Sequence, residues 1–152
     1  MPERYFEDFR PGDVLELGSH AVTEDEIVAF ARQWDPQPFH VDPEAAAASE
    51  FGGLIASTVH IFAMDVALGV KSTPTAAVAA LGFDNMRTIA PVRPGDVLTK
   101  VNEVIARRPS NSRPGIGVVT FRDTLHNQHG EPVFTFENTA LIRMRSGGAD
   151  AD

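Results

Sequence analysis

The sequence predicts an α+β domain in which a strongly curved antiparallel sheet surrounds one long, mostly apolar helix. Strand-like runs are concentrated after residue 77, an apolar helical segment comes directly before them, and strands and helices do not alternate as they do in βαβ units. The 152 residues are enough for a sizeable core, and we expect a single domain over residues 1–152. A hydrophobic fraction of 43% with 22% charged residues is that of an ordinary globular protein.

The chain opens with a predicted strand and a predicted helix. Residues 14–22 are expected to form the strand. Thr23 and Glu26 have the spacing of a capping box, in which each side chain accepts a hydrogen bond from the other residue's backbone N–H. An amphipathic helix is therefore expected to run from this point to about Gln33.

Residues 34–41 predict a tight loop stiffened by proline. Pro36 and Pro38 disfavour helix at the residue before each of them. Asp42 followed by Pro43 is typical of a helix start, with the acid as N-cap and the proline at the first helical position. We expect a short alanine-rich helical turn to follow.

The segment of about 57–70 predicts the central helix. Its apolar residues recur with few polar interruptions, which favours burial. Asp65 is unusual in such a helix, because a buried carboxylate needs a partner such as an arginine. We interpret His60, in the same helix, as a core or interface histidine and not as a catalytic one.

Four runs after this helix predict an antiparallel meander. They cover about residues 78–83, 96–106, 115–126 and 132–144. Residues 127–130, with the sequence Asn-Gln-His-Gly, are expected to form the hairpin turn between the last two strands. Residues 146–152 predict a flexible tail.

One six-residue sequence occurs twice. Arg10–Leu15 and Arg93–Leu98 both read Arg-Pro-Gly-Asp-Val-Leu. Proline and glycine suit the two central positions of a type II turn, where the glycine supplies a positive φ. Each copy is therefore expected to turn the chain and begin a strand.

Composition excludes several classes of function. Without cysteine, the chain has no disulfide, thiolate zinc site, iron–sulfur ligation or cysteine nucleophile. A net charge of −8 argues against nucleic acid as a partner, although the basic residues between 87 and 122 could meet a small anion or form a solvated face. No secretion signal, membrane-spanning run or zinc-site spacing is present, so we expect a cytoplasmic protein with no membrane partner and no metal.

A carboxylate and an imidazole stand five residues apart in the proline-stiffened loop. Five extended residues span roughly 16 Å, so the loop must bend if Asp35 and His40 are to act on one water as a general acid/base pair. Two structural alternatives remain open at this point. Asp35 before Pro36 can simply end a helix, and His40 can be incidental to the helix start that follows.

The start of the central helix is a second candidate. Gly52 and Gly53 give a flexible turn before Ser57 and Thr58, where free backbone N–H groups and the helix dipole could stabilise an oxyanion. Paired glycines also serve close packing, and serine or threonine at this place also serves as a plain N-cap.

Together these motifs resemble the MaoC-like dehydratases, the hot-dog-fold group that contains the (R)-specific enoyl-CoA hydratases. The resemblance is carried by the segments 30–42, 51–57 and 93–96 and covers about residues 5–144. The spacing of an Asp, four residues and then a His after a short helix is its specific part, whereas Pro-Gly-Asp turns occur in hot-dog proteins generally. It implies a hot-dog fold, with the sheet wrapped around the apolar helix.

The resemblance also assigns roles. Asp35 and His40 match the catalytic pair that holds one water, the backbone N–H of Thr58 matches the oxyanion donor, and Gln37 matches an asparagine beside the active loop. The other expected substrate-binding residues are Gly53, Ser57, Arg87 and Arg93, and the CoA phosphates are expected to meet some of Arg87, Arg93, Arg107, Arg108 and Arg113.

Several positions depart from the family pattern. Thr58 stands where the family has glycine, so the donor keeps its place only if φ is negative there. Trp34 and Phe39 add bulk that either narrows the acyl pocket or packs in the core.

The activity that the resemblance implies is the reversible addition of water to a trans-2-enoyl-CoA, giving an (R)-3-hydroxyacyl-CoA in fatty acid metabolism. The acyl-CoA is then the substrate, no cofactor is needed, and two copies join their sheets edge to edge as a homodimer. Two other functions remain open: a hot-dog acyl-CoA thioesterase, in which a carboxylate directs water at the thioester carbonyl, and a non-catalytic acyl-CoA binding module.

Overall fold

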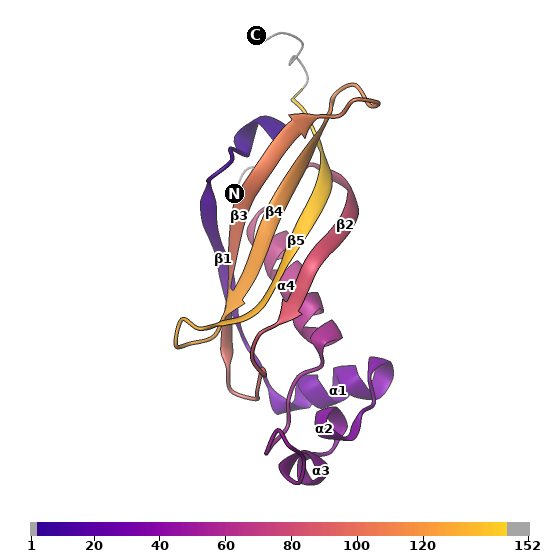
Figure 1. Cartoon of the computed structure of the whole chain (residues 1–152), viewed down its shortest axis with the longest axis vertical. Coiled ribbons are helices and arrows are strands. Elements are labelled where there is room, and N and C mark those ends of the chain that lie inside the picture. The colour runs from indigo at the N-terminus through magenta and orange to yellow at the C-terminus, as the bar shows by residue number, and fades with distance from the viewer. Residues whose placement is uncertain (1–2, 146–152) are drawn as a thin grey trace.

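A computed structural model describes residues 3–145 of the chain. Five strands form one antiparallel sheet in the order β1-β3-β4-β5-β2, and the sheet curves around helix α4 (Figure 1). The strands are β1 (Val14–Ala21), β2 (Ala77–Thr88), β3 (Val97–Pro109), β4 (Ile116–His126) and β5 (Pro132–Arg143). The helices are the 3-10 turn η1 (Phe6–Asp8), then α1 (Glu24–Trp34), α2 (Pro38–Val41), α3 (Pro43–Ala47) and α4 (Thr58–Ser72).

The α+β class is confirmed, and the last three of the four predicted runs form the expected meander, whereas the first, β2, pairs with β5 and not with β3. The sheet pairs β3 with β4 and β4 with β5, with the hairpin turn at residues 127–130 between the last two. Helices α1, α2 and α3 gather at one end of the sheet, and α4 runs from that end along its concave face (Figure 1). No helix among residues 3–145 is long and apolar enough to cross a membrane. The predicted tail at 146–152 lies outside the described residues.

The repeated sequence forms the same turn twice. Gly12 and Gly95 have φ of 93° and 90°, which supplies the positive φ that the turn requires. The first copy gives its Gly12 N–H to Val104 O, at 2.8 Å, and the second gives its Gly95 N–H to Val22 O, also at 2.8 Å. The first turn therefore bonds to β3, the strand that the second turn begins. The second turn bonds to Val22, the residue directly after β1, which is the strand that the first turn begins.

Helix α1 begins as predicted. The Thr23 hydroxyl accepts a hydrogen bond from the Glu26 N–H at 3.2 Å, and the Glu26 carboxylate accepts one from the Thr23 N–H at 3.2 Å. At the next start, the Asp42 carboxylate accepts from the N–H groups of Glu44 and Ala45. Both caps satisfy donors that a helix start otherwise leaves free.

Two local predictions are corrected. The loop predicted over 34–41 contains the helical turn α2, because Pro38 occupies a first helical position, where proline is tolerated, and does not break a helix. Strand β2 continues past Phe83 to Thr88, because a bulge near Asn85, with φ of 54°, takes up the turn-forming residues without ending the strand.

The main core lies between α4 and the concave face of the sheet. Ile61 of α4 packs in one cluster with Leu98, Leu125, Phe134 and Phe136 of the sheet. Full burial of such a side chain contributes about 1.5–3 kcal/mol. Since this contact fixes α4 against the sheet, it also fixes both ends of the helix, where two cavities lie.

Candidate active site

Asp35 and His40 face each other across the end of α1. Asp35 is the C-cap of that helix, and its N–H donates to Ala31 O at 2.9 Å. The turn α2 then reverses the chain, with the His40 N–H donating to Gln37 O at 2.9 Å. The result places Asp35 Oδ2 at 3.4 Å from His40 Nε2. The helical turn α2 therefore provides the bend that brings Asp35 and His40 together.

The His40 ring is fixed by a backbone carbonyl. Its Nδ1 lies 2.7 Å from Ile55 O, which can only accept, so Nδ1 carries the proton. In the neutral ring, Nε2 then presents a lone pair toward Asp35. Two acceptors at 3.4 Å do not bond directly, so this gap calls for a shared proton or a bridging water. The sequence could not show the role of Ile55, because a carbonyl leaves no side-chain signal.

The two groups differ in exposure. His40 is 5% exposed, whereas the Asp35 side chain keeps 23% of its surface accessible. Gln37 Nε2 donates to Asp35 Oδ1 at 2.9 Å, which holds that oxygen and leaves Oδ2 toward His40. A carboxylate orientated in this way meets the geometric requirement for proton transfer with the imidazole or with a water between them.

The first turn of α4 closes the site from the other side. Ser57 is buried and acts as N-cap, accepting from the His60 N–H at 3.1 Å. Thr58 follows at the first helical position with a negative φ, since Asn85 alone among the described non-glycine residues has a positive one. The conformational condition for a backbone donor at Thr58 is thus met. The Thr58 hydroxyl lies 3.0 Å from that of Thr88, a residue of β2 that the sequence did not single out.

A cavity of about 390 Å³ joins these groups. Asp35, Gln37, His40 and Thr58 all line it. The rest of the wall is mainly apolar: Phe39, Phe51, Ile55, Ala56, Ile61, Thr88, Ile89, Ala90, Pro91 and Val92. A carboxylate, an imidazole and a helix start therefore converge on one apolar space, as small-molecule sites require.

The two aromatic residues that the sequence singled out have different surroundings. Phe39 lines the cavity, with its ring 4.6 Å from that of His40 and 5.1 Å from that of Phe51, and it also packs against the main core, so both alternatives apply to it. Trp34 is 65% exposed and lies outside the cavity and outside the core clusters. Trp34 therefore neither narrows the acyl pocket nor packs in the core.

Arg93 and Gly53 lie together at the loop beside the cavity. Arg93 donates to Phe51 O at 2.6 Å, and a Cβ at Gly53 would be 3.2 Å from its guanidinium. Arg93 therefore holds the loop that carries the Phe51 ring. Neither Arg93 nor Gly53 lines the cavity. Ser57 does not line it either, and serves as the N-cap of α4.

The other arginines predicted to meet the CoA phosphates lie at different positions along the strands. Arg87 is paired with Thr135, next to the cavity end of β2. Arg107 is aligned through Val119 with Ala140, six residues along β5 from Phe134 and roughly 20 Å away along the strand. Arg108 and Arg113 lie at or beyond the same end. Only Arg87 and Arg93 are thus near the cavity of their own chain.

His60 is a packed histidine, as interpreted from the sequence. Its ring stacks on Phe30 at 4.5 Å, and its Nε2 lies 3.6 Å from the Glu26 carboxylate, which also meets His20 at 2.7 Å. Burial lowers the pKa of His60, and Glu26 opposes that shift. Across residues 3–145, no three His, Asp or Glu side chains are arranged to hold a metal ion.

The chain is similar in sequence to known proteins. A family model described as MaoC like domain matches residues 8–122. The YdeM protein of Bacillus subtilis is 32% identical over 139 residues, which cover 90% of this chain and 97% of that protein. Mesaconyl-CoA hydratase of Cereibacter sphaeroides is 32% identical over 155 residues, which cover 97% of this chain and 43% of the hydratase. The chain therefore spans less than half the length of that enzyme.

Solved structures agree with this similarity. A MaoC-like dehydratase from Rhodospirillum rubrum has a TM-score of 0.88 and 39% identity over 94% of this chain and 99% of that one. A Mycobacterium tuberculosis protein with a double hot-dog fold has a TM-score of 0.79 and 19% identity, over 99% of this chain and 47% of that one. The predicted hot-dog fold is confirmed.

Proposed function

The chain belongs to the MaoC-like domain family, and we propose that it catalyses the reversible addition of water to a trans-2-enoyl-CoA, giving an (R)-3-hydroxyacyl-CoA. One observation carries the proposal: Asp35 and His40 face each other at 3.4 Å in the wall of an apolar cavity that also contains the start of α4. The (R) product is proposed by analogy with the hydratases that the sequence resembles.

In the proposed reaction, the water lies in the cavity beside Asp35 and His40, within hydrogen-bond reach of both, and its oxygen bonds to C3 of the enoyl group. One member of the pair takes the water proton. The π electrons of the C2–C3 bond move onto the thioester carbonyl, and the other member then gives a proton to C2.

The negative charge that develops on the carbonyl oxygen needs a donor. The first intrahelical hydrogen bond of α4 runs from the Ile61 N–H to Ser57 O, at 3.0 Å. Because the N–H of Thr58 comes before that bond, it has no partner within the helix and is free to donate to the carbonyl oxygen of the thioester. The helix dipole adds partial positive charge at the same place. A preorganised donor of this kind is worth about 10²–10³ in kcat.

The acyl chain and the CoA have separate partners in this proposal. The apolar wall around Ile61 and Val92 takes the acyl chain. Arg87 and Arg93 lie beside the cavity and are proposed to meet the CoA phosphates. No step of the proposed reaction needs a metal or a cofactor.

We also propose that two copies join along β2. The edge strands are β1 and β2, and exposed large apolar side chains gather on β2, at Leu81, Phe83 and Met86. The exposed face of α4 adds Val59, Val66 and Val70. A second copy of the chain would cover both faces and extend the sheet. The active site would then lie near the interface, since Thr88 ends β2 and lines the cavity.

The test follows two signals at once. Purified protein is mixed with short, medium and branched trans-2-enoyl-CoAs while the enoyl absorbance and the free thiol are measured together. We expect the absorbance to fall without thiol release, and Asp35→Asn to lower the rate by about 10²–10⁴ with an unchanged melting temperature. The product is then resolved by chirality, with (R) expected.

Three outcomes contradict the proposal. Thiol release identifies a thioesterase, an Asn variant with full activity removes Asp35 from the chemistry, and acyl-CoA binding without turnover of any enoyl-CoA identifies a binding module. Sedimentation of the protein as a monomer at micromolar concentration would contradict the dimer alone.

A further inference from the structure

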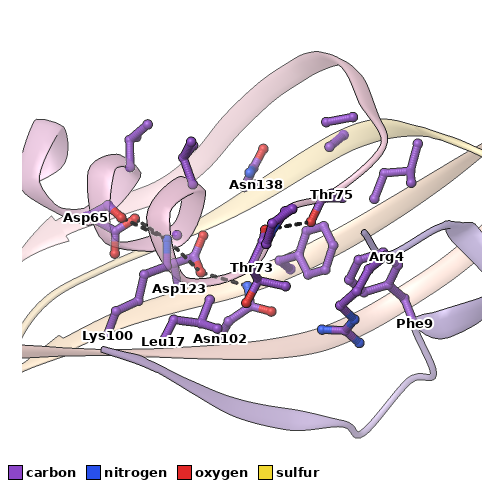
Figure 2. Close-up of a pocket in the computed structure, with 18 of the residues that line it drawn as sticks. Arg4, Phe9, Leu17, Asp65, Thr73, Thr75, Lys100, Asn102, Asp123 and Asn138 are labelled. Atoms are coloured by element: carbon purple, nitrogen blue, oxygen red, sulfur yellow. Dashed lines mark hydrogen bonds and ion pairs between the residues drawn. The ribbon is translucent and has the colours of Figure 1, made fainter. Parts of the chain in front are cut away.

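The two cavities at the ends of α4 differ in what a ligand can reach. Figure 2 shows the one of about 420 Å³, beside Lys100, Asp65 and Asp123. These three side chains pair with one another and are at most 4% exposed, so they are closed to a ligand. The cavity of about 390 Å³ that contains Asp35 and His40 is different, because part of its apolar wall is exposed. A ligand can contact that part directly.

Phe51 forms the exposed part of this wall on the loop between α3 and α4. On the inner side, Ile61 and Val92 belong to the main core and are at most 1% exposed, so packing fixes their positions. Two large apolar side chains of the wall are exposed, Phe51 at 37% and Ile89 at 51%. Ile89 directly follows β2, the edge along which a second copy is proposed to join. Phe51 does not belong to that edge, and it lies in none of the core clusters.

The backbone of Phe51 is held on both sides. Its N–H donates to the Ser49 hydroxyl at 3.2 Å, and that hydroxyl donates to Ala46 O of α3 at 2.6 Å. Its carbonyl accepts a hydrogen bond from the Arg93 guanidinium at 2.6 Å. The Gly52 N–H donates to Ser49 O at 3.1 Å, which closes the turn. Polar contacts of the loop, and not burial in the core, therefore set the place of the Phe51 ring.

The Phe51 ring reaches the catalytic pair through one other ring. It lies 5.1 Å from the Phe39 ring, which lies 4.6 Å from the ring of His40. An acyl group in the cavity would cover the exposed surface of Phe51, and burial of apolar surface favours that contact. An acyl group too large for the space between Phe51 and the inner wall would have to displace the ring or the core. The ring is the part that can yield.

We propose that Phe51 determines the size of the acyl group that the cavity admits, and that Arg93 is a positioning residue that acts through Phe51. This role rests on the proposed hydration of enoyl-CoAs and extends it to the choice among them. A short acyl chain lies between the ring and the inner wall at Ile61 and Val92, whereas a long chain meets the ring.

The test compares crotonyl-CoA with trans-2-decenoyl-CoA as substrates of the full chain. The measured quantity is the decenoyl to crotonyl ratio of kcat/KM, because both substrates carry the same CoA and its contacts cancel in the ratio. Phe51→Ala should raise this ratio about tenfold or more, since one methylene in an apolar pocket already changes discrimination by about 10–200-fold. Phe51→Trp, with a larger ring, should lower it about threefold.

Arg93→Met tests the positioning role. It removes the hydrogen bond to Phe51 O, so the ratio should rise as in Phe51→Ala, by a smaller factor of about threefold. Any loss of contact with the CoA phosphates raises KM for both substrates alike and leaves the ratio unchanged. The matched control is Trp34→Ala, which removes an exposed aromatic ring next to Asp35 in the sequence but outside the cavity. It should leave the ratio unchanged.

Two outcomes overturn the role of Phe51 alone. One is a wild-type ratio in both Phe51 variants at the wild-type melting temperature. The other is a KM that rises by the same factor for both substrates, which would place Phe51 against CoA and not against the acyl group. If Phe51→Ala has a lowered melting temperature, Phe51→Trp decides the matter. A wild-type protein that hydrates neither substrate contradicts the proposed function itself, and the role of Phe51 with it.

Discussion

The two cavities lie at opposite ends of one helix and have similar volumes, about 390 and 420 Å³, yet their ionisable groups are arranged in opposite ways. At the first, Asp35 Oδ2 and His40 Nε2 lie 3.4 Å apart, with no direct hydrogen bond between them. At the second, Lys100 donates to Asp65 Oδ2 at 2.6 Å and to Asp65 O at 3.2 Å, and it forms an ion pair with Asp123 at 3.3 Å. The first arrangement leaves the position of a proton open, whereas the second is a buried cluster of one ammonium and two carboxyl groups.

This difference separates chemistry from stability. A pair that transfers protons must not be saturated by its own hydrogen bonds, so it stabilises the fold little. A buried ion pair outside the reaction does no chemistry, but removing one member leaves a charge in a medium that solvates it poorly. Substitutions at the two ends of α4 should therefore change different quantities.

The largest effect is expected at the end of α4 that holds the buried ion pair. Lys100→Met leaves Asp65 and Asp123 buried without their cation, so the free energy of unfolding should fall by about 3–5 kcal/mol. Chemical denaturation at pH 7.5 measures it. The control is Arg122→Met, which removes an exposed cation that also meets two carboxylates, Glu103 and Glu137, and should cost under about 1 kcal/mol. Equal losses in the two variants would contradict the distinction.

At the open end, one atom can be removed without disturbing the helix. Thr58→Pro deletes the backbone N–H at the first helical position, where proline is favoured, and Ser57 already has a ψ of 151°, which suits the residue before a proline. We expect enoyl-CoA hydration to slow by about 10²–10³ with an unchanged melting temperature.

Thr58→Ala keeps the N–H and removes the hydroxyl that meets Thr88. Its rate should stay within about fivefold of wild type. If the Ala and Pro variants are equally slow, the hydroxyl and not the backbone is the donor.

The pH dependence of stability gives the next effect. Burial raises the pKa of Asp65 from 3.8 to about 7, and Lys100 opposes the shift. The folded chain therefore holds a proton that the unfolded chain releases between these values, so this contribution to stability is lost as pH rises from about 4 to 7. From pH 5 to pH 7, the wild type should lose roughly 2 kcal/mol relative to Asp65→Asn. If the difference in free energy of unfolding between the wild type and Asp65→Asn is the same at pH 5 and pH 7, the pKa of Asp65 is not raised and the prediction is wrong.

The smallest effect concerns the orientation of Asp35. Gln37→Leu removes the donor to Asp35 Oδ1, and we expect kcat to fall about fivefold with KM unchanged. The control is Gln33→Leu, at an exposed position four residues earlier in the last turn of α1, and it should alter neither kcat nor KM. A rise in KM alone would instead give Gln37 a role in substrate binding.

Local sequence signals predicted the fold well wherever the physical cause was local. The Thr23 capping box, the two Pro-Gly turns and the meander of β3, β4 and β5 all rest on neighbouring residues, and all are confirmed. The place of β2 beside β5 depends on a distant pairing, and the prediction of one four-stranded meander was wrong there. The prediction of a loop over 34–41 was wrong, since proline was read as a helix breaker where it begins a turn of helix.

The contents of the cavities depend on distant residues. The partner of Asp65 is Lys100 and not an arginine, and no local pattern joins α4 to a strand that lies 35 residues later. A lysine between the buried Leu98 and the partly buried Asn102 is the one signal that could have indicated it, because side chains two apart on a strand share a face. The roles of Asp35 and His40 stay predictions, although the chain does bring them together as the spacing suggested.

The two copies of the Pro-Gly turn have a consequence for how the chain folds. β3, β4 and β5 are joined by short connections, whereas β1 meets β3 only after a long loop has closed at an entropic cost. β1 is therefore expected to join late, onto a meander that already exists. The bonds from Gly12 to Val104 and from Gly95 to Val22 then fix its alignment at both ends, which lets the strand keep the irregularity between Glu16 and Ser19. Amide exchange should accordingly be faster in β1 than in β4, the central strand.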